Sequence, residues 1–262
     1  MKSSYFYRSL GPRCARGLDG ELVEAIRRVR TGHAEVYGYR KVTAALRAQG
    51  LVVNRKKVLR HLRALGLLQP RRIKGEKWTR PAVVKPAEAN TYWEMDFTYV
   101  WTGSANAYLC PVIDGWDRDV VGDVFSERCR CQEAAQALER AVLARFGARV
   151  PEGHELLLRI DRGPQFIAKR FKAAAKTLNV RLEYAGIQCP EDKPYVESFN
   201  GKYKAEEVYR REYRGFTEAQ RSWQSYKTWY RQERLHESLG YRSPRAFREA
   251  FQTGQKSKEC VA

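Results

Sequence analysis

Residues 160–166 read Ile160-Asp161-Arg162-Gly163-Pro164-Gln165-Phe166 and follow an apolar run, Leu156 to Leu158. This run predicts a short strand over 155–160, and residues 165–178 predict a helix. Asp161 therefore stands where a strand ends and before the glycine of a turn. In open α/β sheets, polar side chains at strand ends are positioned for chemistry, but an aspartate here can also simply begin a turn. The surrounding sequence bears on both interpretations.

The segment from residue 90 to residue 185 alternates between strand and helix patterns. Residues 92–100, YWEMDFTYV, are rich in aromatic and β-branched side chains and predict a strand. Three strands followed by alternating helices and strands predict an α/β fold with a mixed five-stranded sheet flanked by helices. The other expected strands are 107–113, 120–126 and 181–185, and the other expected helices are 133–146, 194–213 and 217–232.

A pair of short helices is predicted between Val36 and Leu68. The first, over 39–46, is ended by Gly50, and Asn54 offers an N-cap for the second. On the second helix an apolar face (Val58, Leu62, Leu65) opposes a basic face (Lys56, Arg60, Arg63). This is the layout of a helix-turn-helix whose second helix enters a DNA groove, and the candidate DNA contacts are Lys56, Lys57, Arg60 and Arg63. The alternative is an ordinary helical pair with a solvated basic face.

The composition favours a polyanionic partner. The 262 residues include 49 Lys or Arg against 30 Asp or Glu, which gives a net charge of +19. Between Arg55 and Lys85 there are eleven Lys or Arg and a single acid, Glu76, so residues 70–88 are expected to form a basic linker. No apolar run approaches the roughly 20 residues that span a bilayer. We therefore expect a nucleic-acid partner, no membrane, and a cytoplasmic, nucleoid-associated protein.

Two more carboxylates complete a candidate metal site with Asp161. Asp96 lies between two apolar residues of the first predicted strand, an expensive position for a charge unless a metal or another partner compensates it. Glu197 lies early in the helix predicted over 194–213. A carboxylate trio from a strand, a strand end and a helix can hold two Mg²⁺ ions about 3.5 to 4 Å apart, which suits in-line attack at phosphorus. The competing interpretation is a buried aspartate satisfied by backbone donors at 96 and a simple cap at 161.

These acidic residues lie in motifs that resemble a known family. WEMDFTYV (93–100), IDRGPQF (160–166) and PYVESFNGKYK (194–204) resemble the three acidic motifs of DDE transposases and retroviral integrases. More narrowly, the chain is similar to the catalytic OrfB product of the insertion-sequence-three family, in its helix-turn-helix (37–67) and in RLHESLGYRSPRAF (234–247).

The resemblance implies an RNase H-like catalytic domain with Asp96, Asp161 and Glu197 as catalytic residues and metal ligands. The implied cofactor is Mg²⁺ or Mn²⁺, with two ions per active site. The implied reaction is hydrolysis of a phosphodiester at the element's end, followed by attack of the freed 3′-hydroxyl on another phosphodiester.

Several further positions match or depart from the family pattern. Lys204 stands where the family has a basic residue seven positions after the glutamate, which implies a DNA phosphate contact beside the metals. Gly163 and Gln165 match a family glycine and glutamine; the glycine permits a tight turn close to DNA, and Gln165 is a candidate DNA contact. Three residues replace the usual Ser, Asn and Asn of the family, namely Ile160, Lys193 and Arg231. None of these departures removes a metal ligand.

The expected organisation is an N-terminal segment (1–20), a helix-turn-helix domain (21–69), the basic linker (70–88), an RNase H-like integrase catalytic domain (89–250) and a flexible tail (251–262). The implied function is transposition on double-stranded DNA, at element ends and target, by a homo-oligomer. The resemblance also implies an upstream OrfA-type product as a partner, because it supplies an oligomerisation segment that this sequence does not show. The alternative functions are a non-catalytic sequence-specific DNA-binding regulator, a degenerate transposase product, or a general RNase H-type nuclease that cuts without joining ends.

Overall fold

The computed structural model of the chain describes residues 17–69, 85–186 and 193–259. The chain divides into two compact units, Met1–Arg71 and Arg72–Ala262. Most of the expected basic linker (70–84) and most of the expected N-terminal segment (1–16) lie outside the described residues.

The first unit is a small bundle of helices. Helix α1 (Gly20–Val29) is followed by a 3₁₀ helix (Gly32–Val36), α2 (Tyr39–Ala48) and α3 (Arg55–Ala64). The predicted helical pair is confirmed as α2 and α3, and the Asn54 side chain caps α3 by accepting a hydrogen bond from the Lys56 N–H at 2.8 Å. Helix α1 adds a third helix to this pair. The apolar faces of the three helices meet in a fully buried core of Ile26, Val42, Leu46, Val58 and Leu62.

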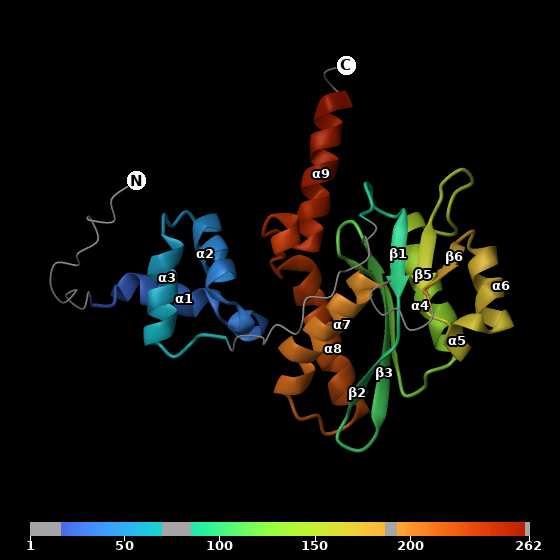
Figure 1. Cartoon of the computed structure of the whole chain (residues 1–262), viewed down its shortest axis with the longest axis horizontal. Coiled ribbons are helices and arrows are strands. Elements are labelled where there is room, and N and C mark those ends of the chain that lie inside the picture. Colours follow the sequence, from blue (N-terminus) through green and yellow to red (C-terminus); the bar gives the residue numbers. More distant parts are fainter. Residues whose placement is uncertain (1–16, 70–84, 187–192, 260–262) are drawn as a thin grey trace, which may run out of the picture. The chain divides into compact units, whose positions relative to one another are not determined.

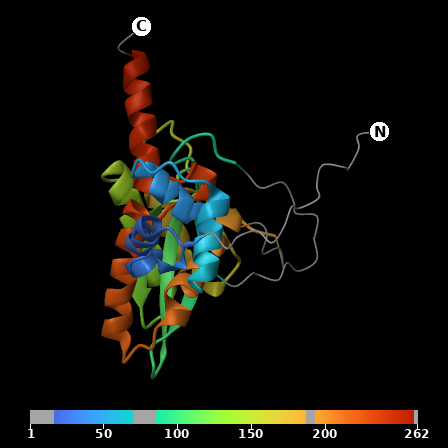
Figure 2. The same cartoon turned by 90° about the vertical axis from the view of Figure 1, so that its left-hand side faces the viewer.

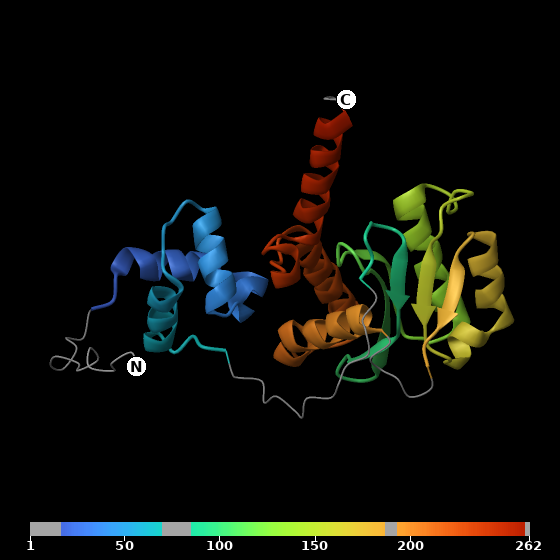
Figure 3. The same cartoon turned by 45° about the horizontal axis from the view of Figure 1, so that its top comes forward.

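The second unit is built on a mixed sheet flanked by helices, as predicted (Figures 1 and 3). Strand β1 (Tyr92–Met95) pairs antiparallel with β3 (Asn106–Asp114) and parallel with β5 (Leu157–Ile160). Strand β6 (Arg181–Tyr184) continues the parallel part beside β5, while β4 (Val120–Ser126) and β2 (Thr98–Trp101) pair antiparallel with β3.

The sheet has six strands, so the expectation of five was wrong. The segment 92–100, expected as one strand, is β1 and β2, which are separated by Asp96 and Phe97 and both pair with β3. The register places Pro111 of β3 opposite this break, and proline has no N–H to donate to the ladder. The Asp96 carboxylate turns toward a cation, and the Phe97 ring packs against Phe166 at 5.7 Å between centroids.

Helices cover both faces of this sheet (Figures 1 and 3). One face carries α4 (Cys131–Phe146), α5 (Pro164–Ile167) and α6 (Lys169–Thr177), and the other carries α7 (Pro194–Glu206) and α8 (Phe216–Gln232). The core under α4 and α6 is aliphatic and aromatic, with Trp93, Leu138 and Phe166 fully buried. Between α7 and α8 lies a cluster of rings from Phe199, Tyr203, Trp223, Tyr226 and Tyr230.

Three helical regions differ from the expected ones by more than two residues. The helix expected over 165–178 is divided at Ala168 into α5 and α6, and the helix expected over 194–213 ends at Glu206, before a 3₁₀ turn (Val208–Arg210). A second 3₁₀ turn (Glu237–Leu239) precedes α9 (Pro244–Glu259), so residues 251–259, expected as part of a flexible tail, are helical. Helix α9 projects beyond the sheet (Figure 2), and it is anchored because the rings of Phe247 and Phe251 both lie 4.8 Å from that of Trp116. No helix in the described residues is both long enough and apolar enough to cross a membrane.

One glycine sets the distance between the sheet and α4. A Cβ added to Gly122 of β4 would lie 2.5 Å from the Ala141 backbone nitrogen and 2.6 Å from the Ala137 carbonyl oxygen. Both contacts are to helix backbone, which cannot move as a side-chain end can. Helix α4 therefore packs against β4 only because residue 122 has no side chain.

Gly122→Ala should destabilise the second unit by about 1 to 3 kcal/mol, the usual cost of overpacking a core. The matched control is Gly201→Ala in α7, where an added Cβ meets nothing within 4 Å. That change should stabilise by about 0.5 to 1 kcal/mol, because alanine is the better helix former. Urea unfolding of both variants gives the two free energies, and equal effects of the same sign would contradict the tight contact at Gly122.

Candidate functional site

Asp161 uses its two carboxylate oxygens for two different purposes. Oδ1 accepts a hydrogen bond from the Gly163 N–H at 2.7 Å, which shapes the turn after β5. Oδ2 lies 3.4 Å from the Lys193 ammonium nitrogen. A Cβ on Gly163 would lie 2.8 Å from Asp161 Oδ1 and 2.6 Å from the Gln165 side-chain nitrogen, so glycine is needed for this turn to close. Asp161 therefore begins a turn and also faces a charge.

Asp96 reaches the same cation from the neighbouring strand. Its Oδ1 lies 3.1 Å from the Lys193 ammonium nitrogen. In the parallel pairing of β1 with β5, Trp93 stands opposite Leu158 and Glu94 opposite Arg159, and continuing this register brings Asp96 level with Asp161. Burial raises the pKa of Asp96, while the positive charge of Lys193 opposes that shift.

A buried carboxylate on β1 fixes the start of helix α7. Glu94 is fully buried, and its Oε2 accepts hydrogen bonds from the Tyr195 N–H at 2.7 Å and the Val196 N–H at 2.8 Å. Its Oε1 accepts a third from the Tyr92 hydroxyl at 3.1 Å. The first N–H groups of a helix have no partner within the helix, so Glu94 caps α7 from another element. This contact ties α7 to the strand that carries Asp96, two residues further on.

Glu197 lies on the first turn of α7 and is half-buried. Its backbone N–H donates to the Lys193 carbonyl at 3.1 Å, so it stands one helical turn beyond the lysine that contacts both aspartates. Among the residues that the structure describes, no three acidic, histidine or cysteine side chains already form a metal cluster. The structure thus brings Asp96 and Asp161 together around Lys193 and places Glu197 one turn further along α7. The three carboxylates do not form a metal-binding cluster in this arrangement.

Lys204, further along α7, is packed over an aromatic ring near Asp96. Its ammonium nitrogen lies 4.0 Å from the centroid of the Tyr99 ring. Burial lowers the pKa of Lys204, and the negative charge of Asp96 opposes this shift. Tyr99 and Trp101 are the two exposed side chains of β2, at 60% and 57% exposure. Sequence reasoning did not single out Tyr99, although the alternation of β2 places it on the open face with Trp101.

In the first unit, the candidate DNA contacts lie on the outer face of α3. Lys56, Arg60 and Arg63 are exposed, as the basic face of the predicted recognition helix requires. Lys57 differs, because its ammonium pairs with Asp19 Oδ2 at 2.6 Å. The buried His61 ring accepts the Asp19 N–H at 3.0 Å and bonds the Lys57 carbonyl at 2.8 Å, so these contacts hold α3 against the start of α1.

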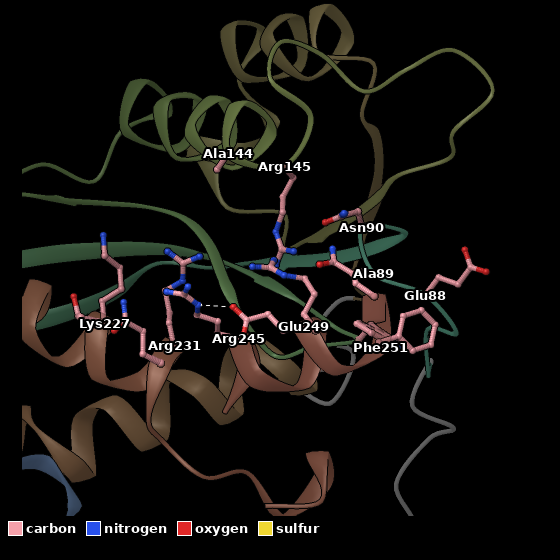
Figure 4. A pocket seen from close by; sticks show the side chains of 15 residues that line it. Glu88, Ala89, Asn90, Ala144, Arg145, Lys227, Arg231, Arg245, Glu249 and Phe251 are labelled. Atoms are coloured by element: carbon pink, nitrogen blue, oxygen red, sulfur yellow. Dashed lines mark hydrogen bonds and ion pairs between the residues drawn. The ribbon is translucent and has the colours of Figure 1, made fainter. Parts of the chain in front are cut away.

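A separate cavity of about 670 Å³ lies between α4, α8 and α9 and is lined by basic side chains (Figure 4). Among the side chains that line it, Arg145 pairs with Asp117 at 3.0 Å and Asp119 at 3.2 Å, and Arg231 pairs with Asp119 at 2.7 Å. Burial is the larger of two causes, with the negative charge of Asp114, that raise the pKa of Asp117 to about 7. The guanidinium groups of Arg145 and Arg231 are matched by buried aspartates, whereas Arg245 pairs with the exposed Glu249. Arg231 is thus part of an ion-pair network that joins α4 and α8.

The two units match known protein families. An HTH-like domain matches residues 18–75, and models of an integrase core domain match residues 86–190 and 178–244. A putative transposase for insertion sequence element IS986/IS6110 of Mycobacterium tuberculosis is 28% identical over 85% of this chain and 84% of its own length. The chain belongs to the integrase-core transposases of insertion sequences.

Other members of the family extend the match. The transposase for insertion sequence element IS629 of Shigella sonnei is 29% identical over 89% of this chain and 80% of its own length. Transposase InsF for insertion sequence IS3A of Escherichia coli is 31% identical over 65% of this chain and 62% of its own length. These matches confirm the resemblance seen in the acidic motifs, and they confirm that this transposase is an enzyme.

The buried carboxyl of Glu94 should make the stability of this transposase depend on pH. Burial raises the pKa of Glu94 to about 7, from a usual 4.5. A carboxyl whose folded pKa is raised contributes stability that is fully present below its unfolded pKa and is lost as the pH rises through the folded pKa. The wild type should therefore lose up to about 3 kcal/mol relative to Glu94→Gln between pH 4.5 and pH 7.

Urea unfolding of both proteins across this range gives the difference directly, since other titrating groups are common to both. Glu94→Ala is the informative companion, because it leaves two buried N–H groups of α7 without an acceptor and should cost at least about 2 kcal/mol at every pH. Parallel stability curves for the wild type and Glu94→Gln would contradict the buried carboxyl as the source of the effect.

Proposed function

We propose that this transposase cleaves DNA at the ends of an insertion sequence and joins strands by 3′-hydroxyl attack, with Asp96, Asp161 and Glu197 as catalytic metal ligands. The observation that supports this best is the convergence of Asp96 and Asp161 on one buried cation, at 3.1 and 3.4 Å. Carboxylates gathered around a cation site offer the hard oxygen donors that Mg²⁺ and Mn²⁺ prefer. Glu197 is the third ligand in this proposal, because α7 is tied to β1 by Glu94.

The proposed cofactor is Mg²⁺ or Mn²⁺, with two ions per active site. When bound, such ions polarise the phosphoryl oxygen and stabilise the leaving 3′-oxygen. The protein's own groups bind and orient the DNA. In this proposal Lys204, beside Asp96, contacts a phosphate, and Gln165 contacts the backbone or a base from the turn after Asp161.

The proposed partner is double-stranded DNA, both at the element ends and at the target. Lys56, Arg60 and Arg63 on the exposed face of α3 would contact it, with Lys57 contributing once it leaves Asp19. We further propose that a homo-oligomer forms on the DNA, that an upstream OrfA-type product joins it, and that the protein acts in the cytoplasm at the nucleoid.

One observation favours a second candidate, a non-catalytic DNA-binding regulator or degenerate transposase product. Lys193 already neutralises part of the charge of Asp96 and Asp161, where the proposed metal ions would bind. Such a regulator would bind DNA in a salt-sensitive way and give no metal-dependent product. Cleavage assays separate the two candidates.

Asp161→Asn should bind a labelled duplex that carries a candidate element end with the affinity of the wild type. Its metal-dependent cleavage should fall by at least about 10³-fold, because a metal ligand contributes several kcal/mol to stabilisation of the transition state. Nicked and joined products are scored with Mg²⁺, Mn²⁺ or EDTA. Glu152→Gln, at a side chain 84% exposed, is the charge-matched control and should cleave normally.

Nicking by Asp161→Asn at the wild-type level would exclude the proposed site. Tight binding by the wild type with no product under any metal would favour the regulator instead.

Arg60→Ala and Arg63→Ala should each weaken duplex binding at all salt concentrations tested and reduce the slope of log K against log salt by about 1, since each removes one phosphate contact. Lys57→Ala should have a smaller effect, because its ammonium is paired with Asp19 at 2.6 Å. Lys176→Ala, which removes a charge from α6, is the control. Fluorescence anisotropy over a salt series measures all four, and an unchanged slope for both arginine variants would rule out α3 as the phosphate-binding helix.

A further inference from the structure

Lys193 is a buried ammonium in the place where the proposed function requires metal ions. Its side chain is 6% exposed and contacts Asp96 at 3.1 Å and Asp161 at 3.4 Å. A buried ammonium is costly unless its charge is compensated, so the two aspartates are what keep Lys193 inside. Its carbonyl accepts the Glu197 N–H at 3.1 Å, which joins the lysine to the third proposed ligand through one turn of helix.

We propose that Lys193 is an internal counter-cation that competes with divalent metal for Asp96 and Asp161, and that DNA relieves this competition by offering its ammonium a phosphate. This inference rests on the proposed function. A divalent ion and an ammonium cannot both lie between the same two carboxylates, because they would repel each other strongly at separations of about 3 to 4 Å. Metal binding therefore requires the ammonium to leave.

The geometry gives the lysine a way to leave. Lys193 is the residue before the first turn of α7, and its backbone stays fixed because Glu94 holds the next two N–H groups, at 2.7 and 2.8 Å. The four-carbon side chain carries a compact point charge that can move from one anion to another without the backbone moving. A phosphate beside the carboxylates would compensate the ammonium after metal has replaced it there.

The expected consequence is coupling between metal and DNA. In the free protein, Lys193 lowers the affinity for divalent metal; on DNA, the lysine pairs with phosphate and the affinity rises. By linkage, metal must then tighten DNA binding by the same factor. Asparagine at position 193 has no charge, so it would remove both the competition and most of the coupling.

The test measures Mn²⁺ binding to the full chain by the loss of the free-ion electron paramagnetic resonance signal, with and without a short duplex of arbitrary sequence. Lys193→Asn should bind Mn²⁺ at least about tenfold more tightly than the wild type without DNA. DNA should increase the affinity of the wild type by a larger factor than that of the variant. Lys227→Asn is the matched control, because Lys227 also pairs with an aspartate, Asp123 at 2.8 Å, and its loss should leave Mn²⁺ binding unchanged.

A second readout covers folding. Without metal, Lys193→Asn should melt at a lower temperature than the wild type, because Asp96 and Asp161 then face each other uncompensated, and saturating Mn²⁺ should restore the loss. Equal Mn²⁺ affinity of the wild type and Lys193→Asn would overturn the proposal, as would an equal effect of DNA on both. If neither protein binds Mn²⁺ with or without DNA, the proposed metal site itself is wrong. If Asp161→Asn loses Mn²⁺ binding but Lys193→Asn binds Mn²⁺ as the wild type does, the metal site stands and only the proposed competition by Lys193 is wrong.

Discussion

The arrangement of the site depends on one buried interaction, the capping of α7 by Glu94. A carboxyl group in the middle of a sheet is costly to ionise, and here two backbone N–H groups and a tyrosine hydroxyl, at 2.7 to 3.1 Å, offset part of that cost. The contact sets where α7 begins relative to β1. Lys193, Glu197 and Lys204 all belong to this helix or its cap, so their positions relative to Asp96 follow from it.

The two aspartates are brought together by a different device, the parallel register of β1 and β5. Neighbouring parallel strands keep their residues in step, so side chains just past the two ends meet without any loop having to fold back. The break after β1 then frees Asp96 from the ladder, and the turn at Gly163 directs Asp161. The same carboxylate that closes this turn also faces the cation, so the two interpretations of Asp161 do not compete.

Much of this could be predicted from the sequence, and the failures have identifiable causes. The cap at Asn54, the apolar stripe of α3 and the strand patterns other than that of residues 92–100 are local signals, and the structure confirms them. Glu94 was missed because its role depends on a helix about a hundred residues away, which no periodicity reveals. Lys193 was visible only as a departure from a family pattern, since its contacts exist only after the strands have paired.

Two other predictions, the single strand over 92–100 and the flexible tail from residue 251, were wrong although local sequence signals pointed to the observed structure. Pro111 stands opposite the break between β1 and β2, and its missing N–H argued against one continuous ladder there. Phe247 and Phe251 are spaced for one face of a helix, which argued against a flexible tail. Arg231 is explained by its pairing with Asp119, a buried partner that an uncharged amide could not neutralise.

The ion pairs beneath α8 and α9 also separate two responses to ionic strength. Asp117, Asp119 and Arg145 are all buried, so dissolved ions reach the pairs between them poorly, while the arginines of α3 stand in open solvent. Concentrated salt should consequently strip bound nucleic acid from this strongly basic chain long before it loosens the packing of the helices. Purification in such a buffer would yield protein free of host DNA and still folded.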